Sequence, residues 1–239
     1  MAGEPWWIAD AALSLERKAA VARAARGVNL GDSFLIVTEG TVTEPEYFRL
    51  LRDDLKLSTV TIHVQPGDAS HPLHVIATAV RLVKERSAEM KKYREEQSFS
   101  KTPFDHVWAV IDTDVAVRDG IWNEVKQAAA AGNVSLAPST PCIEYWLLLH
   151  LKYSTGGLTN GTAAKSALKA VGFDCSTTEA AEESVPRLIS KWPHAVKQAE
   201  RVRNYHFSGK TPEPANPSTD VDLLVRALDD SVPAHRRKL

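Results

Sequence analysis

Asp112 and Asp114 are the residues whose type and spacing most directly suggest chemistry. They follow the short apolar run of residues 107–111, which is typical of a strand covered on both faces. Side chains two positions apart on an extended backbone point the same way, so the two carboxylates would repel each other without a cation between them. Magnesium prefers such oxygen ligands. A polar turn after a strand is the alternative, because Asp is common in turns.

Glu39 and Glu144 are two further acids at predicted strand ends. Glu39 follows the apolar run 33–38 and precedes a predicted helix, and such turns form the ligand crevice at the carboxyl edge of an α/β sheet. Glu144 falls in the first turn of an apolar helix for which Thr140 is the expected N-cap. A carboxylate there is costly unless it is paired or metal-bound. The alternatives are a simple turn cap at Glu39 and a loose capping box at Glu144.

Four predicted strands alternate with helices, which is typical of a mostly parallel α/β sheet with helices on both faces. The strands are expected at 33–38, 59–65, 106–112 and 133–137. Helices are expected at 9–26, 43–55, 72–95, 121–131, 141–150, 162–171, 180–205 with a break at Trp192–Pro193, and 220–228. The predicted organisation is an N-terminal helical extension (1–30), an α/β domain (31–151) and a helical part packed on it (152–239). All four acids would then share the carboxyl edge of one sheet.

The composition of the 239 residues argues against several classes of protein. A net charge of −1 provides no global basic field, so nucleic-acid binding would need a local patch. Lys84, Lys91 and Lys92 form one basic region and Arg201 and Arg203 another, with solvated helix faces as the alternative. Two cysteines are too few for a disulfide framework, which favours a reducing, cytoplasmic setting. We expect no membrane span and no signal peptide.

Four segments occur in an order and at separations that resemble one known family. Residues 38–48 (TEGTVTEPEYF) are similar to a CEGEKTEPNYF box, and residues 107–114 (VWAVIDTD) to a VWCVFDRD strand. Residues 139–150 (STPCIEYWLLLH) are similar to an SNPCFELWLLLHF helix, and residues 216–221 (NPSTDV) to a closing NPST-V element. The chain thereby resembles the RloB-like family over roughly residues 30–228.

The resemblance implies a TOPRIM-like fold and metal-dependent phosphodiester chemistry. Position by position, Glu39 would be a metal ligand or general acid/base, and Asp112 and Asp114 would be ligands of Mg²⁺ or Mn²⁺. Glu144 would be an additional catalytic acid. The implied activity is that of a nuclease on RNA, such as transfer RNA, or on DNA, in prokaryotic antiviral defence and abortive infection. The implied partners are the nucleic acid and an AAA or ABC-type ATPase such as an RloA-like protein, and assembly into homo-oligomers is compatible with this function.

The chain departs from the family pattern at positions that could contact phosphate. Thr113 stands where the family has Arg, and Thr140 stands where it has Asn. The Lys that usually follows the first glycine of the first box is also shifted or missing. If the family's cations hold phosphate, we expect another cation to do so here, with Arg49, Lys84 and Arg118 as candidates.

Two other functions compete with a nuclease. One is a non-catalytic scaffold or sensor that binds the ATPase and keeps its acids as relics, to which the near-neutral charge gives some support. The other is a small-nucleotide-binding α/β domain, which the lack of any Gly-x-Gly-x-x-Gly or Walker sequence argues against. Metal bound between Glu39 and the two aspartates would favour the nuclease, whereas carboxylates that are splayed apart or held in salt bridges would favour the scaffold.

Overall fold

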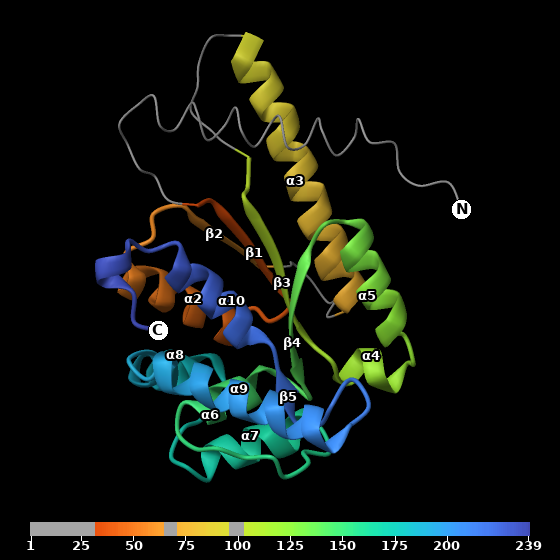
Figure 1. Ribbon diagram of the computed structural model, residues 1–239, viewed down its shortest axis with the longest axis vertical. Helices are drawn as coiled ribbons and strands as arrows, with labels where there is room; N and C mark the ends of the chain where they lie inside the picture. The colour runs from red at the N-terminus through yellow and green to blue at the C-terminus, as the bar shows by residue number, and fades with distance from the viewer. Residues whose placement is uncertain (1–31, 65–70, 96–102) are drawn as a thin grey trace.

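A computed structural model describes residues 32–64, 71–95 and 103–239 of the chain (Figure 1). The helix expected at 9–26 and the N-terminal extension lie outside these residues. None of the helices within the described ranges is both long and apolar enough to cross a membrane.

The centre of the fold is a five-stranded sheet with the strand order β2-β1-β3-β4-β5. Its strands are β1 (Phe34–Thr38), β2 (Val60–Val64), β3 (His106–Asp112), β4 (Ser135–Thr140) and β5 (Ser218–Thr219). The first four run parallel, which confirms the predicted α/β class, and β5 pairs antiparallel with the end of β4. The strand β5 was not predicted, because a two-residue strand beside a proline-rich segment has no periodicity to detect.

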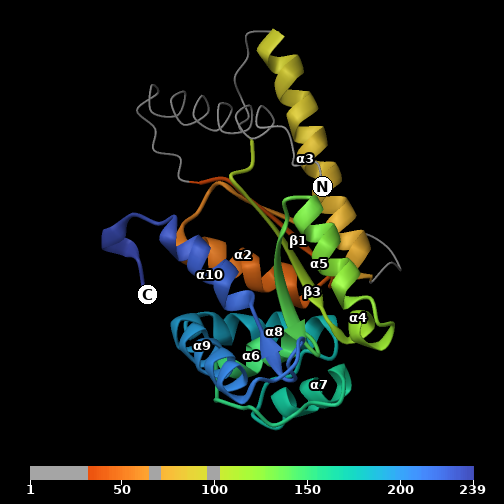
Figure 2. The ribbon, with the colours of Figure 1, turned by 45° about the vertical axis from the view of Figure 1, so that its right-hand side comes forward.

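Helices cover both faces of the sheet, as the strand–helix alternation predicts (Figures 1 and 2). Phe34 and Ile36 of β1 belong to a core cluster with the helices of one face, whereas Leu35 and Val37 belong to a cluster with those of the other face. The first face carries α2 (Thr43–Leu55), α6 (Ile143–Leu149), α7 (Gly161–Lys169), α8 (Thr178–Ile189), α9 (Trp192–Gly209) and α10 (Val221–Asp230). The second face carries α3 (Pro72–Glu95), α4 (Asp114–Arg118) and α5 (Trp122–Ala131).

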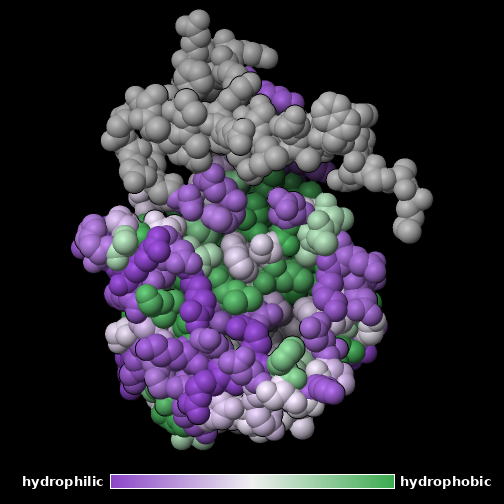
Figure 3. Space-filling view, in the orientation of Figure 1, coloured by the Kyte–Doolittle hydropathy of each residue, from purple (hydrophilic) through white to green (hydrophobic). Residues whose placement is uncertain are grey.

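The helices after residue 152 share one core with the sheet. Leu168, Val185, Trp192 and Leu228 are buried in the same apolar cluster as Phe34 of β1. Figure 3 shows hydrophilic side chains over most of the surface formed by α8 and α9, with an apolar area above it between α10 and α5. These helices therefore follow the amphipathic rule, with their apolar faces toward the core. A short 3₁₀ helix, η1 (Ala234–Arg236), follows near the C-terminus.

Local predictions differ from the structure mainly at element ends. The predicted break at Trp192–Pro193 is confirmed, because α8 ends at Ile189 and α9 begins at Trp192. Thr140 is not the N-cap of α6: it is the last residue of β4, and Cys142 is the N-cap. The reason is tertiary, because pairing of Thr140 with Ser218 of β5 extends the strand beyond the range that its own sequence predicts.

Candidate active site at the carboxyl edge of the sheet

The fold brings the predicted acids to the carboxyl edge of the sheet. Glu39 directly follows β1, Asp112 ends β3, Asp114 begins α4 and Glu144 is the second residue of α6. The chain turns into a helix at Thr113, so the extended geometry assumed for the two aspartates ends at Asp112. Asp114 is exposed and accepts a hydrogen bond from the Val115 N–H at 2.7 Å. The two aspartates therefore share the site, although they lie on different elements.

Asp112 is the residue that links the strands and helices of the site. Its Oδ1 accepts a hydrogen bond from the backbone N–H of Ile143 at 3.0 Å, which joins the end of β3 to the first turn of α6. Its own N–H donates to Glu39 Oε2 at 3.2 Å, which joins β3 to the residue after β1. Burial raises the pKa of Asp112 well above its ordinary value, and the charges of Glu44, Glu39 and Glu144 raise it further.

Glu39 is almost fully buried, with 9% of its surface exposed. Burial raises its pKa to about 7 despite the hydrogen bond from Asp112, and the charges of Glu44 and Asp114 add to this effect. A carboxyl group with such a pKa can exchange a proton near neutral pH. Glu39 therefore does more than cap a turn. It accepts a hydrogen bond from a second strand, and the charges of the neighbouring acids act on its carboxyl group.

Glu44 is a fifth acid at the site, at the start of the helix predicted at 43–55, and the sequence did not identify it as a site residue. It is the second residue of α2, is 5% exposed, and its Oε1 accepts the Gly40 N–H at 3.2 Å. Burial raises the pKa of Glu44 to about 7, and the nearby Glu144 carboxylate raises it further. A side chain at position 40 would overlap the Glu44 carboxylate, so the glycine permits this approach. The signal available in the sequence was the TEPEYF segment itself, in which Glu44 precedes a proline.

These acids surround a cavity of about 420 Å³. Glu44, Asp112, Asp114 and Glu144 contribute to its lining, and Glu39 lies next to it through its hydrogen bond to Asp112. The other lining residues are Gly40–Thr43, Cys142, Ile143, Gly161, Lys165 and Cys175–Thr178. Lys165 is the one Lys or Arg among them, with its Nζ 3.7 Å from Glu144 Oε1. The cavity therefore holds a strong excess of potential negative charge.

A sequence model of the family described as RloB-like protein matches residues 34–228, which is most of the chain. The chain belongs to the RloB-like protein family. No curated protein and no solved structure matches it. The matched range contains all five acids of the site and ends within α10.

Thr113 and Thr140, two of the residues at which this RloB-like protein departs from the motifs expected for the family, contact each other. Thr113 is fully buried, and its hydroxyl donates a hydrogen bond to Thr140 Oγ1 at 2.9 Å. Its backbone N–H donates to the Ser139 carbonyl at 3.0 Å. Position 113 therefore faces β4 rather than solvent, and a matched pair of hydroxyls occupies the place where an Arg and an Asn were expected.

The donor chemistry of the site fits Mg²⁺ or Mn²⁺, because both prefer carboxylate oxygens. Several of these carboxylates lie close enough to raise one another's pKa, which a divalent cation would relieve. Within the described ranges, however, no three His, Cys, Asp or Glu side chains are grouped so that all could hold one ion. Backbone N–H groups bind one carboxylate oxygen each of Asp112, Glu39 and Glu44, and a shared ion would need these side chains to move closer together.

Most basic residues predicted to bind nucleic acid lie away from these acids. Lys84, Lys91 and Lys92 are on α3, which runs away from the carboxyl edge of the sheet (Figure 1). Lys91 lies about 28 Å along the helix axis from Pro72, at 1.5 Å per residue. None of the three lines the acidic cavity. A substrate at the acids would need to extend along the whole molecule to reach Lys91 and Lys92.

The remaining predicted cations take part in local contacts. Arg49 pairs with Glu46 at 3.6 Å, and Arg118 pairs with Asp119 at 2.8 Å. Neither residue lines the acidic cavity, although the charge of Asp114 acts on Arg118. Both residues therefore lie outside the cavity, although Arg118 is close enough to Asp114 for their charges to interact.

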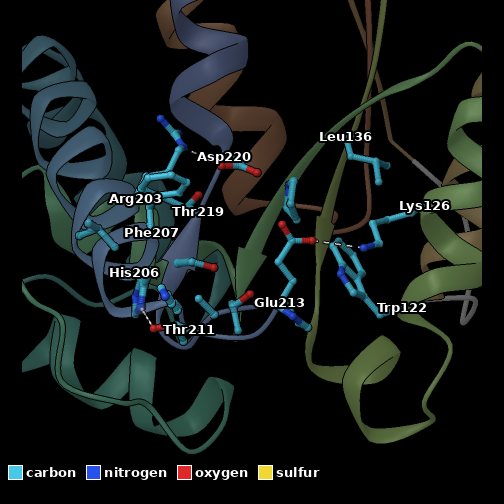
Figure 4. Close-up of a pocket in the computed structure, with 17 residues that line it drawn as sticks. Trp122, Lys126, Leu136, Arg203, His206, Phe207, Thr211, Glu213, Thr219 and Asp220 are labelled. Atoms are coloured by element: carbon cyan, nitrogen blue, oxygen red, sulfur yellow. Dashed lines mark hydrogen bonds and ion pairs between the residues drawn. The ribbon is translucent and has the colours of Figure 1, made fainter.

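Arg201 and Arg203 lie on α9 and differ in their surroundings. Arg201 is exposed and lies over the Tyr153 ring, 4.3 Å from its centroid. Arg203 is half-buried and pairs with Asp220 and the buried Asp222. Figure 4 shows Arg203 beside Asp220 at a second cavity of about 700 Å³, which the Lys126–Glu213 ion pair crosses. Arg203 therefore has a structural role in joining α9 to α10.

Proposed function

We propose that this RloB-like protein is a Mg²⁺- or Mn²⁺-dependent nuclease that hydrolyses phosphodiester bonds in RNA, such as transfer RNA, or in DNA. The observation that carries the proposal is the cluster of five carboxylates at the carboxyl edge of the parallel sheet, four of which line one cavity. In an open α/β sheet this edge is the usual place for a ligand. We also propose, from the family resemblance, that the protein is a cytoplasmic effector of antiviral defence with an ATPase partner.

Asp112, Asp114 and Glu39 are the residues that would hold the metal, with Glu44 and Glu144 next to them. When bound, Mg²⁺ polarises a phosphate oxygen and lowers the pKa of an attacking water. Glu39 would act either as a ligand of that metal or as the general acid/base, and its pKa of about 7 in the metal-free protein supports a role in proton exchange. Attack on phosphorus breaks one P–O bond and leaves a phosphate monoester and a free hydroxyl. Release of Ile143 N–H from Asp112 would couple metal binding to the start of α6.

The test compares purified wild-type protein with Asp112→Asn and Glu39→Gln, with and without its ATPase partner. We expect cleavage of transfer RNA, single-stranded RNA or DNA with Mg²⁺ or Mn²⁺, and a loss of at least about 100-fold in either variant, as for removal of an essential catalytic group. Glu124→Gln, an exposed acid in the first turn of α5, is the matched control and should cleave normally. A wild-type protein that leaves every substrate intact under all these conditions would contradict the proposal.

A non-catalytic scaffold is the second candidate, and the hydrogen bonds of the acids favour it. Glu39, Glu44 and Asp112 each accept a backbone N–H, which gives these carboxylates a structural role without a metal. The scaffold predicts that Asp112→Asn leaves ATPase binding and defence intact, whereas the nuclease predicts that binding persists but defence is lost. Co-purification of the ATPase with Asp112→Asn, together with a phage-protection assay, separates the two functions.

A further inference from the structure

The acidic cavity has a second group of lining residues that comes from a different part of the chain. The acids belong to α2, the end of β3, the start of α4 and the start of α6. Gly161 and Lys165 belong to α7, residues 175–177 to the turn before α8, and Thr178 to the start of α8. In Figures 1 and 2, α7 lies beyond the carboxyl ends of β1 and β3. A ligand at the acids would therefore also meet the α7–α8 segment.

Charge distinguishes these two groups of residues. The acids contribute four carboxylates to the lining, and Lys165 is the single Lys or Arg that the described residues contribute to it. A phosphodiester is an anion, and it would be repelled from carboxylates without cations beside it. A phosphate group of a substrate in this cavity would therefore need a positive charge from the lining residues, and Lys165 supplies one.

The contacts of the Lys165 ammonium group leave it available to bind an anion. Its Nζ is 3.7 Å from Glu144 Oε1, which is longer than a direct hydrogen bond. Its side chain is 49% exposed, whereas that of Glu144 is 6% exposed, so Lys165 remains accessible to solvent at the cavity that both residues line. An ammonium group carries three donors, and a single long contact leaves donors for a ligand.

The turn before α8 adds neutral donors close to Lys165. Ser176, Thr177 and Thr178 line the same cavity. Thr177 Oγ1 accepts the Ala180 N–H at 3.2 Å, which fixes the N-terminus of this twelve-residue helix. Lys169 pairs with Asp174 at 2.7 Å, and Asp174 accepts the Ser176 N–H at 2.9 Å, so α7 and the turn are held together. These contacts therefore hold α7, the helix that carries Lys165, against the turn before α8.

We propose that Lys165 binds a phosphate group of the nucleic-acid substrate next to the scissile phosphate, with the hydroxyls of the turn before α8 as neighbouring donors. This inference rests on the proposed nuclease function and assigns the phosphate contact to α7. Arg49, Lys84 and Arg118, the candidates from sequence, do not line the cavity. Contacts of this kind position the backbone of a substrate without reading its bases, so the site would accept substrates of varied sequence.

The test measures the binding of a short fluorescein-labelled single-stranded RNA, and of DNA of the same sequence, to full-length protein. Asp112→Asn serves as the parent so that bound substrate stays intact, and Lys165→Gln, Lys165→Arg and Lys197→Gln are added to it. Lys197 is an exposed lysine of α9 outside both cavities, so its variant controls for the loss of one charge. Fluorescence anisotropy is recorded between about 50 and 200 mM salt.

We expect Lys165→Gln to weaken binding by about tenfold, as for a lost hydrogen bond to a charged group. The slope of log affinity against log salt should fall by about 0.7, the value for one phosphate contact in a single strand. Lys165→Arg should retain most of the affinity, and Lys197→Gln should match the parent. Equal affinity and equal slope for Lys165→Gln and Lys197→Gln would overturn the proposal.

A purely structural role for Lys165 gives a different pattern. If Lys165 only neutralises Glu144, then Lys165→Gln combined with Glu144→Gln should recover the affinity and slope of the parent, and that recovery would overturn the proposal. If the protein is not a nuclease, the wild type would bind RNA or DNA without cutting it, and the difference in affinity between Lys165→Gln and Lys197→Gln would still be measurable. Failure of the proposed function can therefore be distinguished from failure of this inference. Wild-type protein that binds neither probe at low salt overturns both.

Discussion

At the scale of single residues, the site is built from carboxylates that backbone N–H groups hold in place. Asp112 accepts the Ile143 N–H, Glu39 accepts the Asp112 N–H, and Glu44 accepts the Gly40 N–H. These hydrogen bonds favour the ionised forms, but burial and mutual repulsion outweigh them and raise the pKa of each group. The ionised carboxylates therefore lower the stability of the folded protein at alkaline pH unless a cation is bound.

The pH dependence of the stability of the metal-free protein should reveal the destabilising effect of the ionised Glu39 carboxylate. Its pKa is raised from 4.5 to about 7 in the folded protein, so between these values the folded state binds the proton that the unfolded state has lost. The contribution of Glu39 to the free energy of unfolding therefore falls as the pH rises, by up to about 1.4 kcal/mol per pH unit. With EDTA, Glu39→Gln should match the wild type near pH 4.5 and exceed its stability by about 3 kcal/mol at pH 8.

Urea unfolding of both proteins at a series of pH values measures this difference. Adding Mg²⁺ should stabilise the wild type at pH 8 and reduce the difference, because the ion compensates the carboxylate charge. His150 acts in the opposite direction, since burial lowers its pKa to about 3, but it is present in both proteins and cancels. An advantage of Glu39→Gln that is the same at every pH would contradict the assignment.

At the scale of elements, the site depends on how α2 and α6 are joined. Tyr47 of α2 and His150, the C-cap of α6, are buried and in contact, with Tyr47 Oη 3.1 Å from His150 Nε2. The low pKa of His150 keeps its ring neutral, so Nδ1 donates to the Trp146 carbonyl at 3.1 Å and Nε2 accepts the Tyr47 hydroxyl. The pair fixes the two helices whose first turns carry Glu44 and Glu144.

Tyr47→Phe should lower the free energy of unfolding by about 1–3 kcal/mol, because it leaves a buried histidine nitrogen without its donor. Tyr205→Phe, which removes a hydroxyl from an exposed ring of α9, should change it by less than about 0.5 kcal/mol. Urea unfolding at pH 7 measures both variants. An unchanged stability in Tyr47→Phe would mean that the hydroxyl makes no net contribution to the contact between α2 and α6.

At the scale of the whole molecule, one ion-pair network secures the C-terminal helices to each other. Asp222 of α10 is completely buried, and Arg203 of α9 is its main partner, with Arg226 at 3.9 Å. Burial raises the pKa of Asp222 to about 6, although Arg203 opposes this. The same helices contribute to the core cluster of β1, so loss of the network should weaken the entire protein rather than one part of it.

Arg203→Met should therefore cost about 3–5 kcal/mol at pH 8, as for removal of one partner of a buried ion pair. The cost should be smaller at pH 5, where Asp222 can take up a proton. Arg201→Met, an exposed position on the same helix, should cost less than about 1 kcal/mol.

Tryptophan fluorescence and far-ultraviolet circular dichroism should give one coincident unfolding transition for each protein. Two separate transitions would contradict a shared core. A cost in Arg201→Met equal to that in Arg203→Met would contradict the structural role of the Arg203–Asp222 pair.

The sequence by itself determined the class of fold and most of the acids. Apolar runs within 33–38 and at 107–111 predict strands buried on both faces, and these strands are present as β1 and β3. The carboxyl ends of parallel strands lie at one edge, so the position of Glu39 and Asp112 at strand ends predicts that both lie at that edge, whereas the structure shows that β1 and β3 are neighbours there. Burial and hydrophobic periodicity are local properties of a chain, and local properties can be read from its order of residues.

Only the tertiary structure decided the contacts between residues far apart in the chain. The pairing of β5 with β4, the hydrogen bond between Thr113 and Thr140, and the approach of Lys165 to Glu144 leave no periodic signal. Glu44 could be recognised as a site residue only once the fold brought the starts of α2 and α6 close enough for the charges of Glu44 and Glu144 to interact. The acids could therefore be predicted from local pattern, whereas their hydrogen bonds and the cation that faces them depend on packing across the whole fold.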